Sequence, residues 1–322
     1  MNFEKIFNDF KSKKILIVGD IMIDSYRWGH VERQSPEAPV PIVNLEKKED
    51  RLGGAGNVAL NIKALGAIPI LCSVIGKDFS GNKLLELLRQ EKICADGIFI
   101  DETRKTTTKT RIINNNDQVV RVDDEDLFDI INEQNLLDLI YSKINQVDVI
   151  ILQDYNKGVL TENIIKNIIK KANQKNIAVI VDPKKKNFKK FKNCTLFKPN
   201  LKETIEGLNI KKINDINDIK KAAKKLREVI ECDIVLITLS ERGICVDYNN
   251  KFVHTKAIKR KIVDISGAGD TVLALASLCY SINMDYDNLS KICNISGGLV
   301  CEKVGVVTIN KNELIKEANK HL

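Results

Sequence analysis

From residue 147 onward the chain alternates short apolar runs with amphipathic stretches, and this alternation restricts the fold more than any other feature. We expect strands at 147–152, 177–181, 194–198 and 233–239, with helices at 160–173, 214–230, 287–303 and 311–320. Residues 14–19 form an earlier run of the same kind. Runs that are apolar throughout indicate strands covered on both faces. Strand–helix alternation favours right-handed crossovers, and therefore an α/β fold around a mostly parallel sheet.

Two β-rich stretches interrupt this alternation. Residues 33–44 carry three closely spaced prolines before an alternating pattern, which indicates an edge strand. Residues 105–114 and 118–123 are strand-like and are joined by an Asn-rich turn at 114–117. We expect segments of about 21–52 and 100–124 to form a small β lid over the carboxyl edge of the sheet, although a plain surface hairpin is the alternative. Pairing two lids would cover the exposed strand edges, which predicts a homodimer.

Composition limits the function classes. The 322 residues are 43% hydrophobic and 29% charged, as in an ordinary globular protein, and we expect a single domain over 1–322. No apolar run reaches the length of a membrane span, and no apolar signal core precedes the first strand. The net charge is +8, but aromatic residues make up only 5%, which argues against a nucleic-acid groove. We therefore expect a cytoplasmic protein that binds small molecules.

Cysteine and histidine give little sign of a metal site. The eight cysteines form no C-x-x-C pair and lie mostly in apolar segments, which indicates buried free thiols in a reducing compartment. The three histidines are not spaced as ligands or as a catalytic triad, so we assign them no chemistry and expect no zinc.

The stretch 264–271, Asp-Ile-Ser-Gly-Ala-Gly-Asp-Thr, carries the strongest chemical signal. It joins a strand-like Ile262-Val263 to an apolar helical run at 272–280. A small-residue turn that opens a helix presents unpaired N–H groups at the positive end of the helix dipole, which suits a phosphate. A carboxylate beside such a cradle makes sense if it takes a proton from the group that attacks the phosphate. Asp270 is thus a candidate general base; an ordinary helix-start acid is the alternative.

Other candidates follow the ends of predicted elements. Residues 52–59 form a second glycine-rich helix start, where backbone amides and the Asn57 side chain could bind sugar hydroxyls. Lys109 and Arg111 share one face of a strand and suit a substrate phosphate, although an exposed basic face is as plausible. Asn200 and Glu203 form either a helix capping box or part of a magnesium site. Polar residues repeatedly follow the strands at one edge, where α/β sheets place their ligands.

Taken together, these motifs resemble the ribokinase-like (PfkB) carbohydrate kinases over nearly the whole chain. The resemblance implies a three-layer α/β/α sandwich with a β lid. Within the family, the segments G-D-I-M-I-D, R-Q-S-P-E-A-P-V-P, G-G-A-G-N-V-A-L-N-I, Q-D-Y-N-K-G, V-D-P-K and K-P-N-L-K-E are similar to the heptose 7-phosphate kinases. The implied reaction is ATP-dependent phosphorylation of O1 of D-glycero-β-D-manno-heptose 7-phosphate, for ADP-heptose and surface polysaccharide synthesis.

The resemblance also implies a role for each candidate residue. Catalysis would involve Asp270 and the anion hole of Gly267, Ala268 and Gly269. ATP and Mg²⁺ would lie among Asn200, Glu203, Ser240, Glu241, Gly243 and Asn294, with Glu203 holding Mg²⁺ through water. The sugar phosphate would contact Asp24, Gly53, Gly54, Asn57, Lys109, Arg111, Asp154, Lys157 and Lys184.

Further expectations concern partners and rivals. Some relatives use K⁺, and Asp264 with the loop Val304-Gly305 is our candidate site for it. The adenylyltransferase fused to many relatives carries an H-x-G-H motif, which this sequence lacks, so we expect that second activity to be absent. The rivals are another sugar kinase of this family and a sensor that has lost catalysis. A dinucleotide-dependent oxidoreductase fails because the first strand lacks a G-x-G-x-x-G turn.

Overall fold

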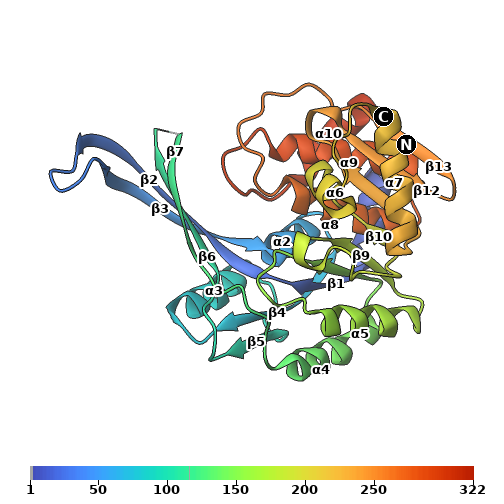
Figure 1. Ribbon diagram of the computed structural model, residues 1–322, viewed down its shortest axis with the longest axis horizontal. Coiled ribbons are helices and arrows are strands. Elements are labelled where there is room, and N and C mark those ends of the chain that lie inside the picture. Colours follow the sequence, from blue (N-terminus) through green and yellow to red (C-terminus); the bar gives the residue numbers. More distant parts are fainter. Residues whose placement is uncertain (1–2, 116) are drawn as a thin grey trace.

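A large, mostly parallel sheet organises the part of the chain that the computed structural model describes, residues 3–115 and 117–322 (Figure 1). Within these residues the strand order is β13-β12-β11-β10-β9-β8-β1-β4-β5. Within these residues, its pairings are parallel except for β11 with β12 and β12 with β13, which are antiparallel. The strands are β1 (Lys14–Gly19), β4 (Ile68–Gly76), β5 (Ile98–Asp101), β8 (Val149–Gln153), β9 (Ala178–Asp182), β10 (Leu196–Phe197), β11 (Ile234–Thr238), β12 (Ile244–Tyr248) and β13 (Lys251–Thr255).

Helices cover both faces of this sheet, which gives the three layers that the sequence predicted. Side chains alternate along a strand, so Ile15 and Ile17 of β1 enter one core cluster while Leu16 and Val18 enter the other. The first cluster includes residues of α1 (Phe3–Asp9), α2 (Ala55–Ala64), α3 (Phe79–Gln90), α8 (Ala268–Ser281), α9 (Tyr286–Val300) and α10 (Lys311–His321). The second includes residues of α4 (Glu133–Lys143), α5 (Glu162–Asn173), α6 (Leu201–Leu208) and α7 (Ile216–Ile230).

The observed elements overlap the predicted ones, with one clear exception. Strand β1 has the predicted bounds, and β8 to β11 overlap the predicted strands. The predicted strand at Ile262-Val263 is wrong, because residues 256–264 form no strand. Ile262 is 56% exposed and lines a cavity. Its apolar side chain therefore forms part of a cavity wall and is not packed in a sheet.

A second sheet forms the lid, as the sequence predicted. Its order within the described residues is β3-β2-β6-β7, with β2 (Ile21–Gln34), β3 (Pro41–Gly54), β6 (Thr108–Asn114) and β7 (Asp117–Asp124). The β2–β3 hairpin projects from the body as a long arm (Figure 1). The turn predicted at 114–117 includes residue 116, which lies outside the described residues. The proline-rich stretch leads into β3, which is an edge strand as expected.

Two features of the sequence can be compared with the described residues directly. All eight cysteines are unpaired; seven are buried and Cys94 is exposed. Across residues 3–115 and 117–322, no helix has both the length and the apolar character that crossing a bilayer requires.

The buried amide of Asn61 ties together the elements that carry the candidate site. Its nitrogen donates to the Asn57 carbonyl and to Asn57 Oδ1 within α2. Its oxygen accepts from the Thr271 hydroxyl on α8 and from the Ile309 N–H. One side chain thus holds the second glycine-rich helix against the helix that begins at the anion hole.

We expect Asn61→Ala to lower the free energy of unfolding by about 2 kcal/mol, because it leaves buried donors without an acceptor. Urea unfolding would measure this. Asn167→Ala is a matched control, since Asn167 makes the same contacts to the residue four positions earlier but is only partly buried. Equal losses for the two variants would contradict the bridging role of Asn61.

Candidate active site

The glycine-rich turn opens α8 as the sequence predicted. Gly267 is the N-cap and has a φ of 79°, a left-handed conformation that favours glycine. A Cβ atom at Gly267 would also lie 2.9 Å from Asn57 Nδ2. Ala268 and Gly269 follow in the first turn, where backbone N–H groups have no helical acceptor four residues earlier. The turn therefore presents amide hydrogens at the positive end of a fourteen-residue helix.

Asp270, in the same turn, is buried and is held by three side-chain donors. Its Oδ2 accepts from Asn57 Nδ2 at 2.8 Å. Its Oδ1 accepts from Gln153 Nε2 at 3.0 Å and from the Tyr155 hydroxyl at 2.8 Å. Burial raises the pKa of Asp270 to about 6, although the hydrogen bonds from Asn57 and Tyr155 act to lower it. A carboxyl with this pKa is mostly ionised at neutral pH and can still accept a proton readily.

A cavity of about 760 Å³ opens beside this turn. It lies along the carboxyl ends of the strands, between α8, α9 and the loop that contains Ile262 and Ile265. Its lining includes Asp270 together with all nine other residues that the sequence assigned to the anion hole and the nucleotide side: Gly267, Ala268, Gly269, Asn200, Glu203, Ser240, Glu241, Gly243 and Asn294. Lys184, expected on the sugar side, also lines this cavity.

The residues expected to bind the sugar gather where the lid joins the sheet. Asp24 of β2 is buried and forms an ion pair with Arg111 of β6. A Cβ atom at Gly53 would lie 2.1 Å from Asp24 Oδ2, so glycine is needed for this close approach. Gly54, with a φ of 57°, is the N-cap of α2, the helix that carries Asn57. Because Asn57 donates to Asp270, these residues are continuous with the candidate base.

The loop after β8 supplies two more candidates. Asp20 accepts hydrogen bonds from the backbone N–H groups of Tyr155, Lys157 and Val159, and so fixes the shape of this loop. Asp154 accepts from the Asn156 N–H and from Asn187 Nδ2, and burial together with the nearby charge of Asp20 raises its pKa. Lys157 reaches the lid, where it pairs with Glu125.

Comparison with known proteins identifies the family. Residues 12–313 match the pfkB family of carbohydrate kinases. The chain belongs to this family. It is 41% identical over 308 residues to the bifunctional protein HldE of Helicobacter acinonychis, which covers 94% of this chain and 65% of that protein. It is 38% identical over 317 residues to the bifunctional protein HldE of Pelobacter propionicus, covering 98% of this chain and 65% of that protein. The chain thus spans less than two thirds of the length of these curated relatives.

Solved structures support the ribokinase-like fold. A structure of phosphofructokinase-2 from Escherichia coli in complex with potassium superposes with a TM-score of 0.79, at 18% identity, over 96% of this chain and 98% of that one. Arabidopsis thaliana ribokinase complexed with ribose and ATP gives a TM-score of 0.75 at 14% identity, over 96% of this chain and 99% of that one. The activity follows from the family match: the protein is a phosphotransferase of the carbohydrate kinase type, with a sugar hydroxyl as acceptor.

In this kinase, sequence reasoning missed two charged residues beside the anion hole. Lys198 and Asp182 are both buried, and the Lys198 ammonium lies 3.0 Å from Asp182 Oδ2. A Cβ atom at Gly269 would lie 3.7 Å from that ammonium. A buried cation at this distance can stabilise negative charge on a bound phosphate. The strand-end segments V-D-P-K and K-P-N contained the signal, but nothing in them showed that the two side chains meet.

The residues present fit a magnesium ion carried by a nucleotide. Asp182 lines the cavity, and its buried Oδ1 has no hydrogen-bond partner within the described residues, although the Lys184 ammonium lies 3.9 Å from it. That oxygen could accept a water or a cation. Within the described residues, no cluster of three or more His, Cys, Asp or Glu side chains could hold a metal alone. Mg²⁺ commonly binds through one or two carboxylates, waters and phosphate oxygens. Asp182 and Glu203 would hold such an ion, which would supply charge neutralisation at the phosphates.

Glu203 also has the structural role that the sequence left open. Its Oε2 accepts from the Asn200 N–H at 2.8 Å while Asn200 Oδ1 accepts from the Glu203 N–H, which is a complete capping box. Its other oxygen pairs with Lys184, and that ammonium lies over the Tyr155 ring. Direct coordination by Glu203 would have to displace one of these partners, so a water-mediated contact is the simpler arrangement.

The remaining predicted residues form the rim of the cavity. Gly243 has a φ of 93°, and a Cβ atom there would lie 1.9 Å from the Thr255 carbonyl oxygen. The turn at Ser240, Glu241 and Gly243 therefore has a fixed shape. Asn294 of α9 donates to the Lys256 carbonyl at 2.7 Å, so its amide nitrogen anchors the loop that leaves β13.

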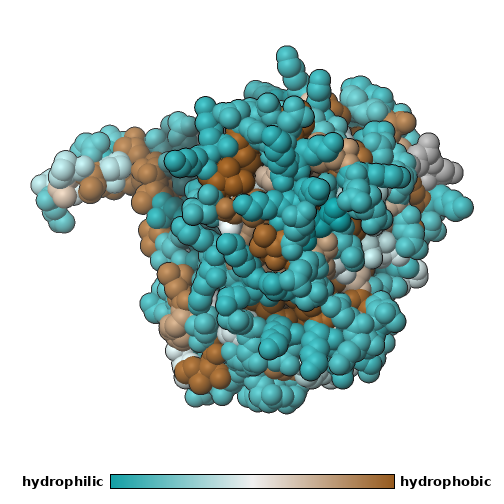
Figure 2. Space-filling model, turned by 45° about the vertical axis from the view of Figure 1, so that its right-hand side comes forward, coloured by the Kyte–Doolittle hydropathy of each residue, from teal (hydrophilic) through white to brown (hydrophobic). Residues whose placement is uncertain are grey.

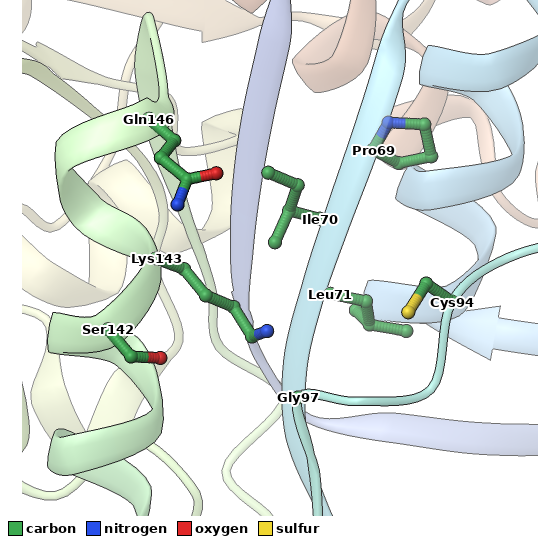
Figure 3. Close-up of a pocket in the computed structure, with 8 residues that line it drawn as sticks. All are labelled: Pro69, Ile70, Leu71, Cys94, Gly97, Ser142, Lys143 and Gln146. Atoms are coloured by element: carbon green, nitrogen blue, oxygen red, sulfur yellow. The ribbon is translucent and has the colours of Figure 1, made fainter.

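A second, smaller cavity of about 200 Å³ lies elsewhere in the fold. It is lined by the early residues of β4 and by the end of α4, with Lys143 on one side and Cys94 on the other (Figure 3). Because it lies toward the amino end of β4, it is remote from the carboxyl edge that carries Asp270. It contains no second charged group to orient a ligand with Lys143.

The pH dependence of this kinase should reveal the hydroxyl that contacts Asp270. Only ionised Asp270 accepts a proton, so we expect kcat/KM to fall as the pH falls through about 6. Tyr155→Phe removes a hydrogen bond that lowers the pKa of Asp270, and the midpoint should move upward by about one pH unit. Tyr141→Phe, on the remote helix α4, is the control. An unchanged midpoint in Tyr155→Phe would show that the hydroxyl does not influence the base.

Proposed function

We propose that this kinase transfers the γ-phosphoryl group of ATP to O1 of D-glycero-β-D-manno-heptose 7-phosphate, giving heptose 1,7-bisphosphate. The observation that carries the proposal is the buried carboxylate of Asp270 beside a glycine-lined set of amide hydrogens, open to a cavity of about 760 Å³. The choice of acceptor is supported by the motif segments shared with heptose 7-phosphate kinases and by the identity to HldE proteins. In the cell, the product would supply ADP-heptose for the lipopolysaccharide core.

Each part of the site has a definite task in this reaction. Asp270 takes the proton of the attacking hydroxyl, while the N–H groups of Gly267, Ala268 and Gly269 stabilise the charge that grows on the transferred phosphoryl group. Asn57 and Gln153 keep the carboxylate oriented. Asp24, Gly53, Gly54, Asn57 and Asp154 bind sugar hydroxyls. Lys198, next to Gly269, neutralises the phosphates of ATP.

The phosphate of the acceptor is assigned to cations of the lid and the adjoining loop. Lys109 and Lys157 lie at the lid–core junction, and both contact Glu125. Arg111 is committed to Asp24, and Lys184 is committed to Glu203 in the nucleotide cavity. Lys109 and Lys157 share one carboxylate, so a single phosphate could take its place between them, and we assign the 7-phosphate to these two lysines.

Three further features belong to the proposal. The protein acts in the cytoplasm as one kinase domain. It forms a homodimer through the lid, whose edge strands β3 and β7 carry exposed apolar side chains at Leu45, Val119, Val120 and Val122 (Figure 2). Sedimentation that finds an active monomer would refute this.

K⁺ orders the turn at Asp264, whose carboxylate accepts from the Ser266 and Gly305 N–H groups. Activity that is insensitive to replacing K⁺ by a bulky organic cation would refute that site.

A panel of acceptors tests the substrate. We expect kcat/KM for heptose 7-phosphate to exceed that for the unphosphorylated heptose by at least about tenfold, because charge-assisted hydrogen bonds to the phosphate are lost. Hexose phosphates should also be poorer acceptors. A coupled assay of ADP release would measure this. Preference for a neutral sugar, or for a hexose phosphate, would overturn the assignment and favour another sugar kinase of this family.

Replacing the base tests the mechanism. Asp270→Asn keeps the shape of the side chain but cannot accept the proton, so we expect kcat to fall by at least about 100-fold. Binding of ATP should persist, and calorimetry would separate binding from turnover. Asp96→Asn is the control. Asp96 is exposed and lies just before β5, so this variant should leave turnover unaltered. Full activity in Asp270→Asn would remove this residue from the mechanism.

A further inference from the structure

Three charged side chains from different elements meet where the lid joins the body. Lys109 lies on β6, Glu125 directly follows β7, and Lys157 lies in the loop after β8. The Lys109 ammonium is 2.9 Å from Glu125 Oε2, and the Lys157 ammonium is 2.5 Å from Glu125 Oε1. Each oxygen of one carboxylate is therefore taken by a different lysine.

The cluster is well shielded from solvent. The side chains of Lys109 and Lys157 are each 12% exposed, and that of Glu125 is 15% exposed. Burial disfavours the charge on Glu125, but the hydrogen bonds from Lys157 and Lys109 outweigh it and lower its pKa below the ordinary value. Lys109 also contacts Asp123 at 3.1 Å. Among the described residues, Lys157 forms no ion pair with another carboxylate, so its charge is balanced by Glu125.

The position of the cluster relates it to the acceptor. Lys109 is paired with Asp24 in the register between β2 and β6, and Asp24 is a candidate ligand for sugar hydroxyls. Lys157 lies three residues after Asp154, in the loop that also brings Tyr155 to Asp270. The two ammonium groups thus belong to the two walls of the sugar side, one from the lid and one from the body.

We propose that Glu125 is a specificity-determining residue. Its carboxylate occupies the position between Lys109 and Lys157 that the distal phosphate of the sugar takes on binding. This inference rests on the proposed function, since it requires a phosphorylated acceptor. A phosphate dianion presents several acceptor oxygens and can satisfy both ammonium groups as Glu125 moves aside. A neutral sugar cannot replace the carboxylate, because it would leave Lys157 without an anion and Lys109 with Asp123 alone.

A purely structural latch predicts the opposite behaviour. If Glu125 only held the lid to the body, neutralising it would loosen the lid and weaken phosphate binding. If it competes with the phosphate for the same two lysines, neutralising it strengthens phosphate binding. The sign of the change in affinity therefore distinguishes the two roles.

The test uses inorganic phosphate as the probe on the full chain, with a non-hydrolysable ATP analogue saturating the nucleotide side so that the anion hole is occupied. Glu125→Gln keeps the size of the side chain and removes its charge. We expect it to bind inorganic phosphate at least about fivefold more tightly than the unchanged protein, measured by calorimetry. KM for the sugar phosphate should fall in parallel, with no gain for the unphosphorylated sugar. Equal or weaker phosphate binding would overturn the inference.

Asp124→Asn is the matched control. It removes the same charge one residue earlier, but Asp124 pairs with the exposed Lys105 and is itself 61% exposed. It should leave phosphate binding unchanged. If Asp124→Asn bound phosphate more tightly by the same factor, the change in net charge would explain the effect, and the inference would be overturned. Should Glu125→Gln fail to fold, Glu125→Asp keeps the charge but shortens its reach, and tighter phosphate binding is expected from it as well. Unchanged or weaker binding in that variant would also overturn the inference.

The two proposals fail in different ways. If the protein phosphorylates heptose 7-phosphate but Glu125→Gln binds phosphate no better, the proposed function stands and the role of Glu125 is wrong. If no heptose phosphate is turned over while Glu125→Gln still binds inorganic phosphate more tightly, the anion site stands and the acceptor is a different phosphorylated sugar.

Discussion

The buried, ionisable carboxylate of Asp270 is the constraint on which the rest of the structure depends. Placing such a group in a protein interior costs free energy unless donors surround it. Here the donors come from α2, from the end of β8 and from the loop that follows, while the carboxylate belongs to α8. The sheet, the helix layer and the loop must all be in place before the charge is compensated. Asn61 then holds α2 and α8 in the relation that this requires.

The sequence predicted the architecture and the glycine-rich start of α8 well, because both depend on local sequence. Continuous apolar runs gave the strands, and the glycine-rich turn gave the start of α8. The donors to Asp270 and the Lys198–Asp182 pair were missed because they are contacts between residues far apart in the chain. The false strand at Ile262-Val263 has a related cause: an apolar pair beside a turn fits a strand or a cavity wall equally well. Glu203 was predicted as a cap or a ligand, and its contacts show the cap.

Charge is distributed differently on the two sides of the site. On the proposed nucleotide side, Asp182 has one oxygen that makes no hydrogen bond within the described residues, and its other oxygen lies beside the Lys198 ammonium, which suits cationic and anionic parts of one ligand. On the sugar side, the charges of Asp24, Arg111, Lys109, Lys157 and Glu125 are already paired with one another. A ligand entering there must exchange partners, whereas on the proposed nucleotide side Asp182 Oδ1 can accept a hydrogen bond without losing one.

The anchoring of the loop after β8 by Asp20 has a consequence for how this enzyme can change. One short loop carries both Tyr155, which touches the base, and Lys157, which faces the lid, and three of its amides converge on a single carboxylate. Remodelling that loop to admit another sugar would also disturb the hydrogen bond from Tyr155 to Asp270. In the proposed reaction, one loop thus affects both the choice of acceptor and the rate of turnover. A new specificity would arise more easily through changes in the β2–β3 arm than through changes in this loop.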